Sequence, residues 1–168
     1  MYNNGMDYLW SPWRMKYIMD KEKSSDCVFC DALLRQDDEN YLILHRGKKV
    51  FIMLNRYPYT SGHLMILPYK HVPTYEDLDV ETRSEIMELI NLATSLLRKT
   101  YHPDAFNMGA NIGEDAGAGI APHLHFHLVP RWRGDSNFMA VTSHTRVLPE
   151  ELKESYQRLK QTWTQLFS

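Results

Sequence analysis

Residues 122–132 read PHLHFHLVPRW, a stretch in which three histidines alternate with three apolar residues. The histidines are His123, His125 and His127. Because successive side chains of an extended strand point to opposite faces, this spacing predicts a strand with three imidazoles on one face and an apolar opposite face. Three such rings would bring like charges together at mildly acid pH, so the pattern indicates a site of chemistry rather than plain packing.

The rest of the chain has the length and composition of one domain. It has 168 residues and a formal net charge of -2. A domain of this length buries about 70% of the surface of its unfolded chain, and the charge gives no global argument for nucleic-acid binding. Residues 1–20 lack the apolar run of a signal peptide, and no stretch approaches the roughly 20 apolar residues that span a bilayer. We therefore expect a cytoplasmic protein with no nucleic-acid or membrane partner.

Apolar patterning predicts five strands. They are residues 41–46, 49–55, 63–68, 106–113 and 123–130. The links between the first three are short, which favours antiparallel pairing of these neighbours.

The same patterning predicts two helices. One runs from Asp79, an expected N-cap, to about Thr100, and its apolar stripe is formed by Ile86, Leu89, Ile90, Ala93, Leu96 and Leu97. The other begins at Pro149, and its stripe, which we expect to pack on the core, is formed by Leu152, Tyr156, Leu159, Trp163 and Leu166. With the strands, these helices predict the α+β class with an antiparallel sheet.

Two kinds of chemistry suit a face of histidines. The imidazoles could chelate zinc, or one neutral imidazole could attack phosphorus as a nucleophile. The segment just before them, residues 111–122, reads NIGEDAGAGIAP, and its glycines leave room for an anion to approach the backbone N–H groups. An anion-binding loop beside a nucleophile favours phosphoryl or nucleotidyl transfer.

With these features the chain resembles the histidine triad superfamily of nucleotide hydrolases and transferases. Residues 54–72, LNRYPYTSGHLMILPYKHV, are similar to the family's Asn-x-x-Pro followed by Gly-His-x-x-x-x-Pro. The segments WSPWRMKYI and VPRWRGDSNFM resemble the branch of dinucleoside polyphosphate phosphorylases and related adenylyltransferases. The resemblance implies a single domain over residues 1–168, with residues 1–24 as an N-terminal extension. It also implies a five-stranded sheet with a long and a C-terminal helix, joined to a second sheet in a homodimer.

The family resemblance further implies an enzyme that cleaves diadenosine tetraphosphate or a similar dinucleotide. In it, His125 attacks the α-phosphorus and carries the nucleotidyl group, with its second ring nitrogen held by the backbone carbonyl of His123. His127 and His63 would face the phosphate. The other implied substrate residues are Asn55 at the ribose, Asn111 near the leaving phosphate, and Met53 and Phe51 around the base.

The loop and the segment after the histidines add two expectations. Many relatives have Ala-Gly-Gln in the loop, whereas this chain has Ala116, Gly117, Ala118 and Gly119. Backbone without that amide is suited to holding an anion, which favours phosphate over water as the acceptor. Trp132 offers a stacking surface for the nucleotide, and its neighbours Arg131, Arg133 and Asp135 include phosphate partners.

Cys27 and Cys30, in the sequence CVFC, have the spacing of a metal or redox pair. Two ligands do not close a tetrahedral zinc site. In zinc-bearing members of the superfamily, histidines at the positions of His71 and His123 complete the set, so the resemblance implies a structural zinc. The alternative is a pair of reduced thiols without metal.

Other functions fit parts of the same pattern. They are a purine nucleoside phosphoramidase, which would be expected to have the Gln-type loop, a nucleotide-binding module with little catalysis, and a zinc-dependent hydrolase, for which the motif lacks a carboxylate base. The N-terminal residues Trp10, Pro12, Trp13 and Arg14 would pack across the sheet or reach a neighbouring subunit.

Overall fold

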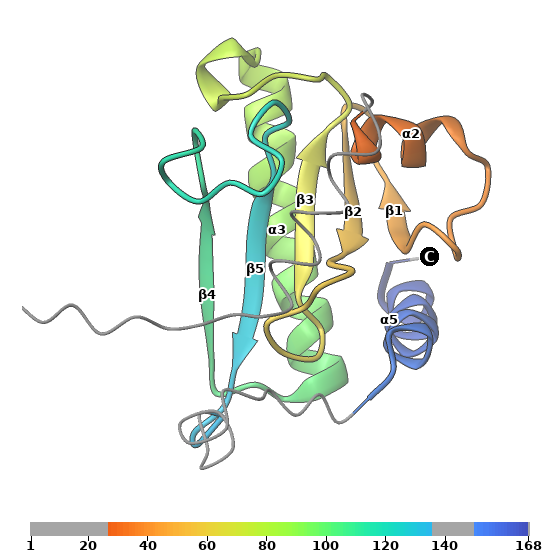
Figure 1. Cartoon of the computed structure of the whole chain (residues 1–168). Coiled ribbons are helices and arrows are strands. Elements are labelled where there is room, and N and C mark those ends of the chain that lie inside the picture. Colours follow the sequence, from red (N-terminus) through yellow and green to blue (C-terminus); the bar gives the residue numbers. More distant parts are fainter. Residues whose placement is uncertain (1–26, 136–149, 168) are drawn as a thin grey trace, which may run out of the picture. The chain divides into compact units, whose positions relative to one another are not determined.

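Five antiparallel strands form the sheet on which the chain is built (Figure 1). The computed structural model describes residues 27–135 and 150–167, which belong to one compact unit. The strands are β1 (Ile43–Arg46), β2 (Val50–Leu54), β3 (Leu64–Pro68), β4 (Ala105–Ala110) and β5 (Phe126–Arg131). The helices are α2 (Val28–Leu34), the 3-10 turn η1 (Tyr75–Asp77), α3 (Val80–Tyr101) and α5 (Leu152–Phe167).

The strand order is β1-β2-β3-β5-β4. All neighbours are antiparallel, as the short links predicted for the first three strands. β5, the last of the described strands along the chain, lies between β3 and the edge strand β4. It contains His127, and His123 and His125 lie in the segment that leads into it. The predicted strand 123–130 is shorter at its start, because the N–H of Leu124 donates to the carbonyl of Val72 at 2.7 Å and the ladder begins only at Phe126.

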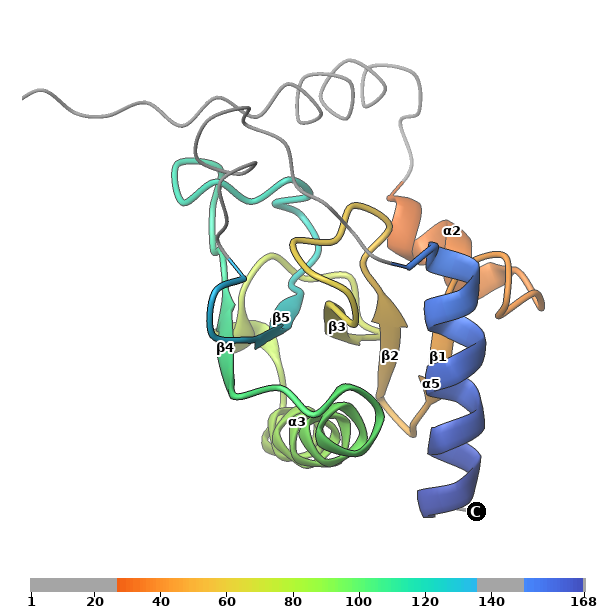
Figure 2. The ribbon, with the colours of Figure 1, turned by 90° about the horizontal axis from the view of Figure 1, so that it is seen from below.

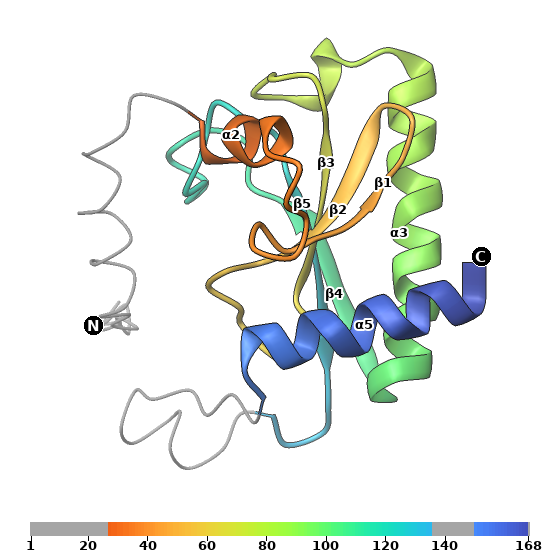
Figure 3. The same ribbon diagram turned by 90° about the vertical axis from the view of Figure 1, so that its right-hand side faces the viewer.

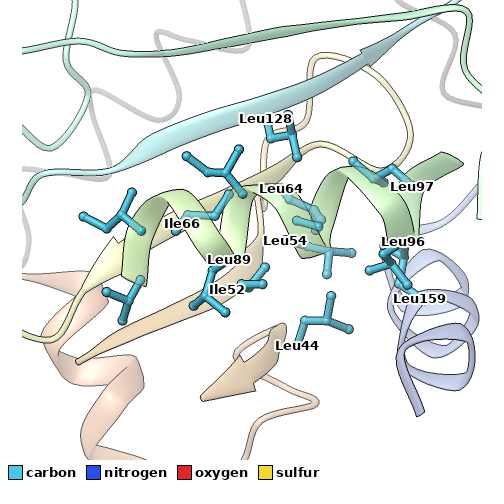
Figure 4. Packing of buried hydrophobic residues seen from close by; sticks show 14 of the residues in the cluster. Leu44, Ile52, Leu54, Leu64, Ile66, Leu89, Leu96, Leu97, Leu128 and Leu159 are labelled. Atoms are coloured by element: carbon cyan, nitrogen blue, oxygen red, sulfur yellow. The ribbon is translucent and has the colours of Figure 1, made fainter. Parts of the chain in front are cut away.

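Helix α3 covers one face of the sheet. It begins as predicted, with the Asp79 carboxylate accepting from the N–H of Thr82 at 2.7 Å. All six predicted stripe residues are buried. They pack with apolar residues of β1, β2, β3 and β5 in the larger of two cores, part of which is shown in Figure 4.

Helix α5 lies along β1, at the edge of the sheet (Figure 2). Its buried residues include Tyr156, Leu159 and Trp163, as predicted. The prediction was wrong for Leu166, which is 40% exposed because it lies in the turn after the last buried residue of the helix. Pro149, the expected start, lies outside the described residues.

A second core lies on the opposite face, under the short helix α2 (Figure 3). It contains Phe29 and Ala32 of α2 together with Ile43, Phe51, Met53, Met65 and Leu67 of the strands. Because both faces are covered, every residue of β2 and β3 is buried. Within the described residues, no helix is both long and apolar enough to cross a membrane. The expected N-terminal extension lies outside these residues.

Candidate active site

The alternation of residues 123–128 separates two faces, as predicted. Leu124 and Leu128 are buried in the core beneath α3, and Phe126 packs against it. The histidines lie on the other face, where the ring of Phe29 from α2 is 5.4 Å from that of His123 and 5.2 Å from that of His125. The reactive side chains are therefore on the same face as the smaller core.

His125 is braced through one ring nitrogen. Its Nδ1 lies 2.8 Å from the backbone carbonyl oxygen of His123. A carbonyl only accepts, so Nδ1 carries the proton and the neutral ring has its lone pair on Nε2. The side chain is 5% exposed, and burial lowers the pKa of His125 despite the hydrogen bond to His123. The ring is thus an uncharged nucleophile with its proton held on the far side.

His127 has the opposite tautomer. The backbone N–H of Tyr59 donates to Nδ1 of His63 at 3.1 Å, and Nε2 of His63 lies 3.0 Å from Nδ1 of His127. His63 therefore holds its proton on Nε2 and donates it, which leaves the proton of His127 on its own Nε2. Burial and, secondarily, the neighbouring His125 lower the pKa of His127 to about 4. The neutral His127 ring therefore offers an N–H, while His125 offers a lone pair.

The loop between β2 and β3 holds Asn55 and His63 in place. The N–H of Asn55 donates to the carbonyl of His63 at 3.0 Å, and the Asn55 side-chain oxygen accepts from the N–H of Tyr57 at 2.9 Å. Gly62, just before His63, has a φ of +78°, and an added Cβ would lie 2.9 Å from the Tyr101 ring. Both constraints explain why glycine precedes this histidine.

Cys27, Cys30, His71 and His123 form a cluster whose ligand atoms all lie within 4.8 Å of one another. Nδ1 of His123 is 3.4 Å from Sγ of Cys27 and 3.6 Å from Sγ of Cys30, and Nδ1 of His71 is 3.2 Å from Sγ of Cys30. A tetrahedral zinc with ordinary bond lengths separates N and S ligands by about 3.5 Å. The four residues predicted as zinc ligands therefore fit that ion.

The partners of the cluster support the same conclusion. Nε2 of His123 lies 3.0 Å from the carbonyl oxygen of Pro68, so it carries the proton and leaves Nδ1 bare toward the thiols. Burial, with the neighbouring Cys27, raises the pKa of Cys30 to about 11. A cation would reverse that preference, because zinc binds the thiolate.

The remaining predicted substrate residues lie on β2 and in the segment between β4 and β5. Ala110 pairs with Phe126, so Asn111 follows β4 beside His125. The Asn111 amide donates to the carbonyl of Gly117 at 3.4 Å, which holds the loop containing Gly117, Ala118 and Gly119. Phe51 and Met53 are buried in the smaller core, with Phe51 stacked on Tyr69.

Trp132 lies away from the three histidines of its own chain. It follows His127 by five residues, about 17 Å along a strand. Its indole N–H donates to the carbonyl of Tyr101 at 3.2 Å. Arg131 pairs with Asp135 and donates to Asn107, and the backbone N–H of Arg133 donates to Asp104. The prediction that Trp132 stacks on the nucleotide stays a prediction.

Sequence reasoning missed two residues beside the histidines. Phe29 contacts two of the rings, and its position inside the CVFC motif was the available signal. Tyr59 contacts the rings of His63 and His127, with centroid distances of 4.6 and 6.0 Å. Its main contribution is a backbone N–H, which residue type does not reveal.

The HIT domain family matches residues 37–134. The AP-4-A phosphorylase of Mycobacterium tuberculosis is 36% identical over 162 residues, 92% of this chain and 83% of the relative. The asymmetrical bis(5'-nucleosyl)-tetraphosphatase of Schizosaccharomyces pombe is 28% identical over 55% of this chain and 50% of its own length. Among solved structures, a Zn-bound histidine triad family protein from Mycobacterium smegmatis has a TM-score of 0.67 and 25% identity, with 84% of this chain and 95% of that one covered.

Proposed function

Because the chain belongs to the histidine triad family, and so is a nucleotide-handling enzyme, we propose that it transfers a nucleotidyl group from a dinucleoside polyphosphate through a covalent intermediate on His125. The observation that carries this proposal is the 2.8 Å contact between Nδ1 of His125 and the carbonyl of His123. It leaves Nε2 unprotonated on a buried, neutral ring.

In the first half of the reaction, Nε2 of His125 forms a bond to the α-phosphorus. The bond from phosphorus to the bridging oxygen breaks, and its electron pair leaves with the polyphosphate. The imidazole gains positive charge at this step, and the His123 carbonyl stabilises the proton on Nδ1. In the second half, an oxygen of the acceptor attacks phosphorus and the P–N bond breaks, which returns His125 to its starting state.

The neighbouring groups would bind the phosphates and the nucleoside. The Nε2–H of His127 donates to a phosphate oxygen, and the backbone at Gly117, Ala118 and Gly119 approaches the polyphosphate. The further assignments are Asn55 to the ribose, Asn111 to the leaving phosphate, and Phe51 and Met53 to the wall of the base pocket.

We propose phosphate as the acceptor. The relative named AP-4-A phosphorylase matches most of the chain, and the loop lacks the glutamine expected of the phosphoramidase branch. Incubation with diadenosine tetraphosphate and phosphate should yield ADP and ATP. AMP and ATP, formed equally well without phosphate, would mean that water is the acceptor.

Intact-mass measurement tests the covalent step. Protein mixed briefly with diadenosine tetraphosphate should gain the mass of one adenylyl group, and His125→Ala should not. A nucleotide-binding module with little catalysis would show no gain in either protein.

We further propose that Cys27, Cys30, His71 and His123 bind a structural zinc. Its support is the fit of the four ligand atoms and the tautomer of His123. The ion would supply no reaction chemistry, only a link between α2 and the segment that enters β5. Thiolate ligands persist in a reducing compartment, in keeping with a cytoplasmic location.

A homodimer formed through β4 is also proposed. Four of the six residues of β4 are exposed: Ala105, Asn107, Met108 and Gly109. Exposed edge strands tend to pair with another strand, and a second copy would supply one. Light scattering at micromolar concentration should give twice the mass of the chain; a monomeric mass would contradict the proposal.

A further inference from the structure

The loop before β3 contacts the histidines through Tyr59. The backbone N–H of Tyr59 is 3.1 Å from Nδ1 of His63, and its ring lies over the imidazoles of His63 and His127. The loop is fixed on either side of this residue. Thr60 donates through Oγ1 to the carbonyl of Pro130 at 3.0 Å, and Tyr57 donates through its N–H to Asn55. The Tyr59 N–H is therefore held in a defined direction.

Two donors reach Nδ1 of His63: the Tyr59 N–H at 3.1 Å and the side-chain amide nitrogen of Asn55 at 3.4 Å. The Tyr59 N–H is the closer donor, and its contact selects between two arrangements of the imidazole pair. A backbone amide cannot accept a proton from the ring, so Nδ1 of a neutral His63 must be the acceptor. In the reverse arrangement, the proton of His63 would be on Nδ1, its Nε2 would accept from Nδ1 of His127, and His127 would present a lone pair. A lone pair repels a phosphate oxygen, whereas an N–H binds it.

We propose that Tyr59 is a positioning residue: its backbone N–H fixes the tautomer of His63, and through His63 it gives His127 the Nε2–H that binds the leaving phosphate. The ring has a supporting part. At 36% exposed, it covers the imidazole pair and keeps water from competing for their 3.0 Å hydrogen bond. The inference rests on the proposed function for the role of His127, but its structural half can be measured without substrate.

The test uses 15N NMR of full-length protein labelled at histidine, since the nitrogen shifts distinguish protonated from bare ring nitrogens. Tyr59→Phe and Tyr59→Ala keep the N–H, and the second removes the ring. Tyr59→Pro removes both, so its difference from Tyr59→Ala isolates the N–H. We expect Tyr59→Phe to keep the Nε2–H signals of His63 and His127, and Tyr59→Pro to lose the single tautomer. A Tyr59→Pro protein with both signals unchanged would overturn the proposal.

A second pair of variants applies if the proline variant does not fold. In His63→Gln the side-chain amide nitrogen takes the place of Nε2 and still reaches His127, whereas in His63→Asn it takes the place of Nδ1 and does not. We expect kcat on diadenosine tetraphosphate to be about tenfold higher for His63→Gln than for His63→Asn, the effect of one hydrogen bond. The His127 Nε2–H signal should survive only in His63→Gln.

Equal losses of kcat in these two variants, with the same His127 spectrum in both, would overturn the inference. That outcome differs from failure of the proposed function, in which the wild-type protein would neither cleave the dinucleotide nor acquire an adenylyl group on His125.

Discussion

The two ends of the histidine row are held in different ways. His123 is fully buried, with Nε2 bound to a carbonyl and Nδ1 directed at two thiols. His127 is bound by another imidazole, which takes its own orientation from a backbone N–H. His125 lies between them. Its Nδ1 is bound by the backbone carbonyl of His123, and its ring lies beside that of His127. One residue type repeated at alternate positions thus receives three roles from the donors and acceptors around it.

The largest effect on catalysis is expected at His125, which lies between the two ends of the row. His125→Ala removes the nucleophile, so kcat should fall by about four orders of magnitude or more. Steady-state kinetics on diadenosine tetraphosphate measures it, with circular dichroism and zinc content as controls for folding. A well-folded variant that retains the normal rate would refute the covalent mechanism.

The metal end can be broken separately. Cys27→Ser should lose the roughly one zinc per chain expected of the wild type and lower the melting temperature by on the order of 10 °C, because metal binding contributes to folding. Val28→Ser, at the next residue along the chain, is the matched control, since Val28 is 51% exposed. Elemental analysis and calorimetry decide the matter. Wild-type protein purified without metal, or equal melting curves for Cys27→Ser and the wild type, would contradict the proposed zinc site.

The imidazole end should be sensitive to pH. The pKa of His127 is about 4 in the fold, against an ordinary 6.5, chiefly because the ring is buried. Between those values the unfolded chain takes up a proton that the folded chain refuses, so stability falls as pH drops from 6.5 toward 4. Between pH 7 and pH 5, this loss of stability is about 2 kcal/mol. The difference between the urea midpoints at pH 7 and pH 5 should be smaller in His127→Gln than in the wild type. An equal difference in the two proteins would contradict the lowered pKa of His127.

The smallest effect concerns Trp132, which lies beyond both ends. Trp132→Phe removes the indole N–H that binds the Tyr101 carbonyl and should cost about 1 kcal/mol of stability. The Michaelis constant should stay within twofold, because the indole is far from His127 along the strand. A tenfold rise in this constant without loss of stability would instead support stacking on the nucleotide.

The regular elements could be predicted because their signals are local. Alternating or continuous apolar segments marked the five strands, and Asp79 marked the start of α3. Helix α2 was missed because seven residues are too few to show a helical period. The place of β5 between β3 and β4 depends on contacts distant in sequence, which no local pattern contains.

For the site, the residue types were predictable, and the family resemblance also implied the contact of His125 with the His123 carbonyl that the structure shows; the tautomer of His127 was not predicted. The Cys-x-x-Cys spacing indicated two metal ligands, the family resemblance supplied His71 and His123, and these four residues do lie together. The tautomers of His125 and His127 are set by the carbonyl of His123 and the N–H of Tyr59. Every residue has such backbone groups, so only their placement in the fold distinguishes these two.

Helix α5 covers the edge strand β1, so changes at the C-terminal end of the chain affect the sheet. The Tyr156 hydroxyl donates to the carbonyl of Ile43 at 3.1 Å, and the Lys160 ammonium group donates to that of Leu44 at 2.8 Å. Ending the chain before Tyr156 would remove both donors and leave the backbone carbonyls of the edge strand β1 unpaired. An exposed edge strand of this kind is prone to aggregation. Affinity tags and fusion partners therefore belong after the helix and should leave its last turns intact.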